Sequence, residues 1–547
     1  MMKSTIAFLI ILLTFAASSL AHTKCGTTEI FQNIHEHHRT KAVSPIAKEA
    51  RSIYSDCATE DFYDSVYTKK TSHFQIFYTL VGPHKTTLAY VDTLSKALED
   101  AWNFHINKTG MLKPLGDTVS FHYQRHVESG LYPVEIVEMT LFRDIAYILK
   151  NRCEDGCYAI TMPSDNAPYS STLLIENDFM YPSAFSPAAD SIVINGKSCA
   201  YGKPNLELYN RTYKYSYAEK WNNALRVTAT HELYHAIQIR YLTPKHNTFW
   251  FEASAVGVEE INNPDIDDYI QYIPDLAGYT GSLNEFKDDY SLGVLYLFFY
   301  NQVAKKFDKS IWESFSKNSE QPFEYQFTQV AQKQGLSADS LFHEFAVRLS
   351  FSGKRAALAN SSFLINKDQS SWPNFRHTRT SSLQAPPEIE PFAYGFYTND
   401  QPDLTNFIGR ASLAIIKDKS YSIHYLPTLN SVDATNTIIK NESGIDSVVW
   451  ILSRFSEEQT LPYEVKDSTL RAYPTPWRHG ALCFTPLSPN KDFIEIRNRR
   501  GNLITKIKYT HNTHCIEESE VKSLMVPGVY RFRVGNSGKL NDFIVIY

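Results

Sequence analysis

Residues 226–238 read Arg-Val-Thr-Ala-Thr-His-Glu-Leu-Tyr-His-Ala-Ile-Gln, and this stretch decides how the middle of the chain folds. His231 and His235 are four residues apart, so on a helix they lie on one face about one turn from each other. Both imidazoles can then reach one metal ion at the ~2.0–2.1 Å that zinc requires. Glu232 points beside that face, where a carboxylate can accept a proton from water without binding the metal. The pattern therefore predicts a zinc site with Glu232 as the general base.

The alternative is a surface helix that carries two solvated histidines. The neighbouring residues argue against it, because they are apolar and predict a buried helix over residues 224–241. These apolar residues are Leu225, Val227, Ala229, Leu233, Ala236 and Ile237. Two histidines and a glutamate are costly to bury unless they have partners, and a metal site supplies partners for all three.

A catalytic zinc ion needs a third protein ligand and one open position. The metzincin pattern requires a glycine and a histidine where this chain has Gln238 and Tyr241, so that class is excluded. The next predicted helix, residues 248–262, starts at Thr248 as a plausible N-cap and carries Glu252. The connection between the two helices is long enough for an antiparallel return, so we expect Glu252 to be the third ligand.

Other residues compete for roles at this site. The competitors for the third ligand are His246 in the connecting loop and Glu259, two turns along the same helix face as Glu252. Glu259 has two open interpretations, a residue that supports the ligands or a solvated helix charge. Tyr290, at the start of a later predicted helix, is a candidate donor to the oxyanion. A packing role is the alternative for Tyr290.

The spacing His-Glu-x-x-His followed by Glu-x-x-Ala, starting at Glu252, resembles the gluzincin clan, which includes the thermolysin-like peptidases. Three further segments resemble a group of secreted bacterial gluzincins: Cys25-Gly-Thr, Ser72-His-Phe-Gln-Ile-Phe-Tyr-Thr and Leu174-Ile-Glu-Asn-Asp-Phe. The resemblance covers roughly residues 25 to 350. It implies a zinc metallopeptidase with one Zn²⁺ per chain, acting on a peptide or protein substrate.

The resemblance also implies a fold. We expect an α+β zincin-like catalytic domain, a mixed sheet plus helices, whose edge strand runs beside the active-site cleft. Ser170–Ile175 is the candidate for this edge strand, where an extended peptide would bind by strand addition. Residues 74–80, 134–139 and 158–162 are further predicted strands, and residues 86–105 form a predicted amphipathic helix.

The start of the chain reads as a signal peptide. Lys3 precedes the apolar stretch 6–17, and Ser19-Leu-Ala ends in small residues suited to cleavage near Ala21. We therefore expect a secreted, extracellular protein. The predicted segments are a signal peptide 1–21, an N-terminal arm or prosegment 22–70, a zincin domain 71–369, a linker 370–387 and a C-terminal β-rich domain 388–547.

The C-terminal domain has short β-rich runs separated by Gly, Asn, Asp and Pro, a pattern typical of an all-β sandwich. Its last runs, Pro527–Val534 and Phe543–Tyr547, resemble the sorting domains of some bacterial secretion systems. That resemblance implies a partner at the cell surface or in a secretion system, and an ordinary sandwich end is the alternative. Cys483 and Cys515 are the two cysteines of the C-terminal third, so we expect them to pair.

Charge and hydropathy exclude other classes. The net charge of −5 comes without a Lys/Arg run, so we expect no nucleic-acid partner. No segment after the signal peptide has the apolar length of a membrane helix, so we expect no transmembrane anchor. Asp265-Ile-Asp-Asp lacks the glycine and the terminal glutamate of a calcium loop, and we expect a surface loop there.

Two functions fit these residues. The first is an active peptidase, and the second is a catalytically idle zincin-fold scaffold that binds extracellular or cell-surface partners through its β-rich module. The intact Glu232 favours the first, because an idle site could lose this residue without penalty.

Overall fold

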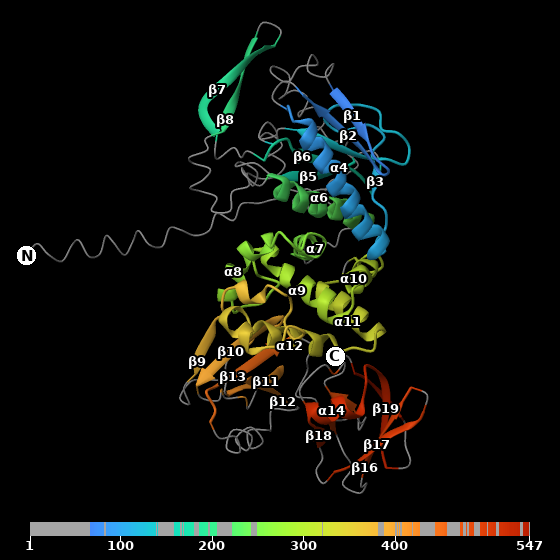
Figure 1. Ribbon diagram of the computed structural model, residues 1–547, viewed down its shortest axis with the longest axis vertical. Coiled ribbons are helices and arrows are strands. Elements are labelled where there is room, and N and C mark those ends of the chain that lie inside the picture. Colours follow the sequence, from blue (N-terminus) through green and yellow to red (C-terminus); the bar gives the residue numbers. More distant parts are fainter. Residues whose placement is uncertain are drawn as a thin grey trace, which may run out of the picture. The chain divides into compact units, whose positions relative to one another are not determined.

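In the computed structural model, the described residues before 242 include a mixed β-sheet and two long helices (Figure 1). The chain divides into two compact units. Unit 1 comprises Met1–Thr243 and Asn262–Ile266, and unit 2 comprises Pro244–Ile261 and Asp267–Tyr547. The structure describes residues 66–80, 84–137, 139, 158–164, 167, 169–179, 185–194, 197–204, 221–241, 249–319, 321–380, 388–399, 402, 404, 407–417, 420–426, 444–456, 471–473, 477, 481–485, 493–499, 501–509, 514–535 and 540–545.

The described strands of the main sheet in unit 1 follow the order β1-β2-β4-β6-β3, with β5 paired to β6. Strands β2, β4 and β6 run parallel, whereas β1 and β5 are antiparallel to their neighbours. Every side chain of β2, β4 and β6 is buried, as expected for parallel strands covered by helices. The bounds are β1 Val66–Lys70, β2 Phe74–Thr79, β3 Leu115–Gly116, β4 Tyr132–Val137, β5 Ala159–Pro163 and β6 Ser170–Glu176.

Strand β6 lies inside this sheet, so the expectation that Ser170–Ile175 is an edge strand is wrong. Leu173, Leu174 and Ile175 each pair with one residue of β4 and with one residue of β5. Among the described residues, β5 pairs with β6 alone and is the outer strand at this end of the sheet. Only Leu173-Leu-Ile in this segment is apolar, so the sequence alone did not show that the whole strand is buried and has neighbours on both sides.

Two long helices contact this sheet and each other. Helix α4 (Leu88–Trp102) begins after Thr87, whose side chain accepts a hydrogen bond from the backbone N–H of Tyr90. It continues as the π-helical η3 (Asn103–Lys108). Helix α6 (Trp221–Gln238) contacts α4, β5 and β6 and ends in the 3₁₀ turn η7 (Ile239–Tyr241). The two predicted helices are confirmed. A further antiparallel pair, β7 (Phe185–Ile194) and β8 (Lys197–Pro204), forms its own two-stranded sheet.

Unit 2 begins with a run of helices that share an aromatic core. The Trp250 ring of α7 has its centroid 4.8 Å from that of Phe323 in α11 and 5.7 Å from that of Phe299 in η10. Many of the aromatic residues of the sequence pack in ring pairs of this kind. The bounds are α7 Phe249–Asn262, η8 Asp268–Tyr272, α8 Ile273–Gly278, η9 Asp289–Leu292, α9 Gly293–Phe298, η10 Phe299–Val303, α10 Phe307–Phe315, α11 Phe323–Lys333, α12 Ala338–Leu349, η11 Gly353–Leu358 and η12 Gln369–Ser371.

Helix α12 packs on a sheet of order β12-β11-β13-β10-β9. The buried imidazole of His343 in α12 joins two strands of this sheet, with Nδ1 2.7 Å from the Ser453 hydroxyl and Nε2 2.6 Å from the Ser412 hydroxyl. The bounds are β9 His377–Thr380, β10 Ala393–Asn399, β11 Arg410–Lys417, β12 Ser420–Leu426 and β13 Ser447–Arg454.

The last part of the chain has its own apolar core around Trp477, Phe484 and Phe532. The disulfide Cys483–Cys515 joins β15 to β18, so the predicted pairing is confirmed. We call residues 471–545 the terminal β module. Its elements are β14 Arg471–Tyr473, β15 Leu482–Thr485, β16 Phe493–Asn498, β17 Leu503–Lys508, β18 His514–Ile516, α14 Glu518–Leu524, β19 Gly528–Val534 and β20 Asn541–Val545.

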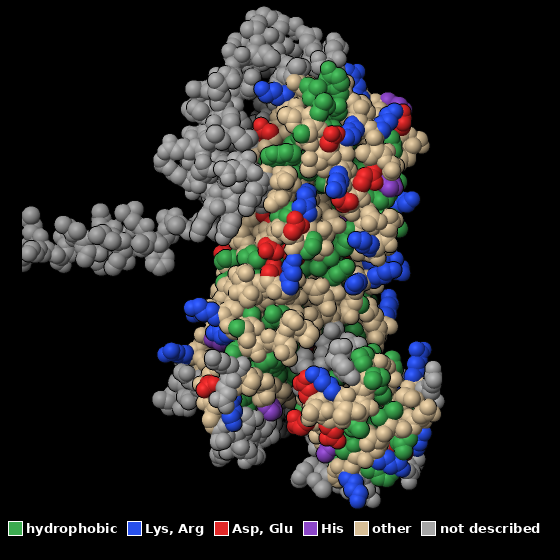
Figure 2. Space-filling model, in the orientation of Figure 1, with side chains coloured by type: hydrophobic (Ala, Val, Ile, Leu, Met, Phe, Trp, Pro, Cys, Tyr) green, Lys and Arg blue, Asp and Glu red, His purple; other side chains and the backbone are tan. Residues whose placement is uncertain are grey.

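The described residues therefore combine a mixed sheet, a set of helices and a β-rich C-terminal part, which agrees with an α+β region followed by β-rich structure. Among the described residues, no helix has the length and apolar character needed to cross a membrane. Acidic and basic side chains are interspersed on the face that Figure 2 shows. The predicted signal peptide 1–21 and most of the predicted arm lie outside the described residues, as do His246 and Thr248.

Candidate metal centre

The His-Glu-x-x-His motif lies in the buried part of α6. Every residue from Val227 to Gln238 is buried, which matches the apolar surroundings of the motif in the sequence. His231 is 2% exposed, Glu232 1% and His235 0%. The interpretation as a solvated surface helix is therefore wrong, and three buried polar side chains require partners.

The two imidazole rings of the motif approach each other through their Nε2 atoms. Nε2 of His231 lies 2.9 Å from Nε2 of His235, and the ring planes are 84° apart. Nδ1 of His235 lies 2.6 Å from Oε1 of Gln238, an amide oxygen that only accepts hydrogen bonds. Nδ1 of a neutral His235 therefore carries the proton, and its Nε2 presents a lone pair toward His231. This is the tautomer that a metal-binding histidine needs.

Glu252 is the predicted third ligand. It lies in the first turn of α7 and is 4% exposed. Its role as the third ligand stays a prediction. Two imidazoles and one carboxylate are a donor set found in catalytic zinc sites, so these residues fit a zinc ion by their chemistry.

The start of α7 is anchored within unit 2. The indole N–H of Trp250 donates a hydrogen bond of 2.9 Å to Oδ1 of Asp308 in α10. A Cβ atom on Gly257 would lie 2.3 Å from the ring of Tyr296 in α9, and one on Gly293 would lie 2.9 Å from the Val256 side chain. Helices α7 and α9 therefore approach each other at two glycines, a distance that larger residues would not permit.

Glu232 is held by the sheet. The hydroxyl of Thr161 in β5 lies 2.8 Å from Oε2 of Glu232 and 2.8 Å from its backbone carbonyl oxygen. Tyr132 of β4 is also buried nearby, and its hydroxyl is 2.7 Å from that of Ser171. Burial raises the pKa of Tyr132, and the Glu232 charge adds to the increase, so this phenol stays neutral.

His105 is a buried histidine that contacts α6 beside the motif and supports this helix. Its Nε2 lies 3.1 Å from the carbonyl oxygen of Thr230, and its ring contacts Tyr234 at a centroid distance of 4.9 Å. Burial lowers the pKa of His105 to about 3, so this ring is neutral and donates its Nε2 proton to the Thr230 carbonyl oxygen.

The remaining candidates have different outcomes. Glu259 is 1% exposed, so its interpretation as a solvated helix charge is wrong, because burial removes it from water. Its alternative role in supporting the ligands stays a prediction. Tyr290 lies in η9, half-buried, with its ring centroid 5.1 Å from that of Tyr272. Its role as an oxyanion donor stays a prediction.

Sequence reasoning missed Gln238 and Thr161. Gln238 follows His235 by three residues, so the helical spacing of the motif already indicated that the two side chains share a face. Thr161 is separated from Glu232 by 71 residues, and no local pattern connects them.

No family model matches the chain, and no curated protein matches it. Among solved structures, the chain is similar to PorZ, described as an essential bacterial surface component of the type-IX secretion system of human oral-microbiomic Porphyromonas gingivalis. The two are 16% identical with a TM-score of 0.14, and the match covers 18% of this chain and 14% of PorZ. A likeness of this size supports no conclusion about fold or function.

Proposed function

We propose that this protein is a secreted zinc metallopeptidase of the gluzincin type, in which His231, His235 and Glu252 hold the metal. The observation that carries the proposal is the buried pair of imidazoles in α6, whose Nε2 atoms lie 2.9 Å apart, with Glu232 next to His231 in the same helix. The Gln238 amide supports it further, since it fixes the His235 tautomer that binds a metal. We also propose that the surrounding fold is zincin-like, with the mixed sheet on one side of α6.

Glu232 is the general base of this proposal. Bound zinc would supply Lewis-acid chemistry, which polarises the scissile carbonyl and acidifies water. The Glu232 carboxylate accepts a proton from the attacking water and passes it to the leaving amine. The Thr161 hydroxyl orients this carboxylate through Oε2, and burial keeps bulk water from competing for it.

The substrate is proposed to bind as an extended strand. With β6 paired on both sides, β5 replaces Ser170–Ile175 as the candidate for strand addition. Strand β5 also carries Thr161, so a substrate strand beside it would lie close to the general base.

The decisive experiment compares Glu232→Gln with the wild-type chain. We expect both purified proteins to contain about one zinc per chain, because Glu232 is not a ligand in this proposal. We expect hydrolysis of casein to fall about 100-fold or more in Glu232→Gln, the usual effect of removing a general base. Glu285→Gln, an amide replacement of an exposed carboxylate, is the matched control and keeps wild-type activity.

Two outcomes would reject the proposal. Wild-type protein without stoichiometric zinc would contradict the metal site. Zinc-loaded protein whose casein hydrolysis is absent, or equal in wild type and Glu232→Gln, would instead support the idle scaffold.

Export is a separate part of the proposal and rests on the sequence of residues 1–21. The mature protein should begin near His22, which intact-mass analysis of protein from the culture medium would test. A chain that keeps Met1 inside the cell would contradict it.

A further inference from the structure

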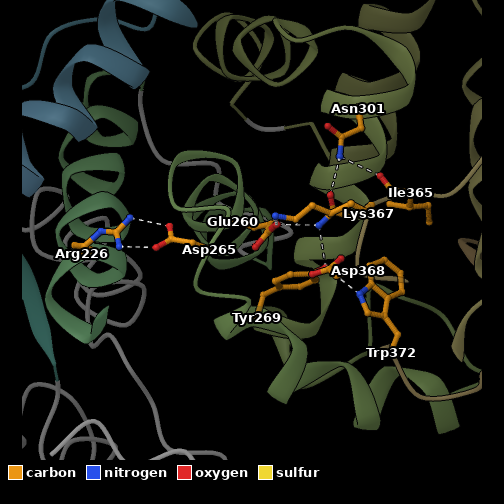
Figure 3. Close-up of polar contacts among 10 residues, drawn as sticks. Arg226, Glu260, Asp265, Tyr269, Asn301, Ile365, Lys367, Asp368 and Trp372 are labelled. Atoms are coloured by element: carbon orange, nitrogen blue, oxygen red, sulfur yellow. Dashed lines mark hydrogen bonds and ion pairs between the residues drawn. The ribbon is translucent and has the colours of Figure 1, made fainter. Parts of the chain in front are cut away.

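A second group of carboxylates lies in unit 2, apart from the zinc ligands. Glu260 lies in the last turn of α7, Asp267 directly precedes η8, and Asp368 directly precedes η12. Each offers one carboxylate oxygen, and these oxygens lie within 4.8 Å of one another. Figure 3 shows Glu260 and Asp368 on neighbouring segments, with Tyr269 and Trp372 beside them.

Glu260, which is buried, and Asp368, which is half-buried, each have one oxygen held by the protein and one without a partner among the described residues. Oε1 of Glu260 accepts a hydrogen bond of 3.0 Å from Asn366, and Oδ1 of Asp368 accepts one of 2.6 Å from the Tyr269 hydroxyl. Oε2 of Glu260 and Oδ2 of Asp368 are buried and have no hydrogen-bond partner. The Glu260 side chain is only 2% exposed, so water reaches it poorly. Buried carboxylate oxygens of this kind are costly unless a cation or a proton satisfies them.

A network of neutral donors holds the two carboxylates in place. The Tyr269 hydroxyl accepts hydrogen bonds from the Trp372 indole at 2.9 Å and from the Asn366 amide at 3.1 Å. It donates its own proton to Asp368. In each of the two carboxylates, the donor hydrogen-bonds to one oxygen, and the second oxygen is the one without a partner (Figure 3). The network therefore directs the remaining oxygens into a fixed arrangement.

The negative charge of the group is weakly compensated by the side chains around it. Lys367 lies 3.9 Å from Oε1 of Glu260, but its side chain is 57% exposed, and exposed pairs contribute little. Burial raises the pKa of Glu260 to about 8, and burial together with the Asp267 charge raises that of Asp368. A bound divalent cation would remove this repulsion.

We propose that Glu260, Asp267 and Asp368 bind a calcium ion. The donors are carboxylate oxygens alone, which suits a hard cation rather than zinc, and calcium accepts irregular oxygen geometry at 2.3–2.6 Å. Neither other aspartate of the 265–268 segment belongs to the group. Asp265 forms a bidentate pair with Arg226, and Asp268 accepts a hydrogen bond from Gln271. The segment thus contributes one ligand, and residues distant in sequence supply the others.

Terbium luminescence tests this site directly in the zinc-loaded full-length protein. Tb³⁺ occupies calcium sites and emits when a nearby aromatic ring absorbs light. Tyr269 and Trp372 lie within the hydrogen-bond network of the ligands, so we expect sensitised emission from one Tb³⁺ per chain. Added Ca²⁺ should displace it, whereas added Zn²⁺ should not.

Variants locate the bound ion. Glu260→Gln and Asp368→Asn keep the shape of each side chain and should weaken Tb³⁺ binding at least 10-fold. Asp267→Asn changes an exposed residue, and it should also weaken binding. Asp268→Asn, the same change one residue away and outside the group, is the matched control and should bind as wild type.

Several outcomes would overturn the proposal. Wild-type protein with no Ca²⁺-displaceable emission would show that a proton shared by Glu260 and Asp368 satisfies the group instead. Emission equally strong in Asp267→Asn, Glu260→Gln and Asp268→Asn would place the ion elsewhere. If Glu260→Gln does not fold, the effect of calcium on the melting temperature of the wild type and of Asp267→Asn is the test. Calcium should raise it in wild type and raise it less in Asp267→Asn, and equal shifts would contradict the site.

Discussion

The Thr161 hydroxyl lies 2.8 Å from both Oε2 and the carbonyl oxygen of Glu232, so one strand residue holds the proposed general base by its side chain and its backbone. Thr161→Val keeps the shape of the residue and removes this hydroxyl. We expect kcat for peptide hydrolysis to fall about 10-fold or more, because a support of the reacting group is lost. KM and zinc content should change little, and steady-state kinetics with metal analysis would measure all three.

Thr161→Ser is the control for that variant, since it keeps the hydroxyl and should stay within about threefold of wild type. Equal activity of the Val and Ser variants would show that Thr161 does not position Glu232.

Gln238 is expected to control zinc affinity through the tautomer of His235. In Gln238→Leu the Nδ1 proton loses its acceptor, and we expect zinc affinity to fall about 10- to 100-fold. Gln238→Glu keeps an acceptor and should bind zinc at least as tightly as wild type. Competition with a chromophoric chelator measures both, and identical affinities in the Leu and Glu variants would contradict this role.

His343 makes stability depend on pH. Burial lowers its folded-state pKa to about 3, against about 6.5 when unfolded. The unfolded state therefore binds more protons between these values, and the stability that is present above pH 6.5 is lost as the pH falls. From pH 7 to pH 5 this one residue should contribute a loss of about 2 kcal/mol. Arg410 and Glu344 also face His343, and both are unchanged in the comparison below.

His343→Gln, which can still bond Ser412 and Ser453, is the comparison. Its urea-derived unfolding free energy should decrease less between pH 7 and pH 5 than that of wild type, by about 2 kcal/mol. Parallel pH profiles for the two proteins would mean that His343 titrates normally in the folded state.

The disulfide should stabilise the terminal β module. Cys483 and Cys515 are 32 residues apart, and closing a loop of this length stabilises a fold by about 3–4 kcal/mol. We expect the double variant Cys483→Ala/Cys515→Ala to lower the calorimetric transition of this module. Reductant should lower the wild-type transition and leave the double variant unchanged, and a reductant effect in both would point to other cysteines.

Local patterns predicted much of the site. The four-residue spacing of His231 and His235, with apolar residues around them, was enough to predict a buried helix that presents both rings on one face. The same kind of information predicted α7 with Glu252 in its first turn. These features depend on residues close in sequence, where helical periodicity decides which side chains meet.

What the sequence could not show depends on contacts between distant residues. The burial of Ser170–Ile175 is only partly readable from the sequence, because its first three residues are polar, and its neighbours are set by strand pairing with residues 134–137 and 159–163. The Asp265–Asp268 segment lies at the surface, as expected, but the sequence could not show that Asp267 lies near Glu260 and Asp368, which come from other elements. Pairing and convergence of this kind arise from the tertiary fold and leave no local periodicity.

The two glycines between α7 and α9 have a consequence for protein engineering. Replacing a helical glycine by alanine normally stabilises a helix by up to ~1 kcal/mol, and it is a common step in making enzymes more heat-resistant. Here the added methyl group on Gly257 would meet the Tyr296 ring at 2.3 Å. The helix would have to shift, and Glu252 and Glu260 would move with it. A routine stabilising substitution would therefore disturb residues of both proposed ion sites at once.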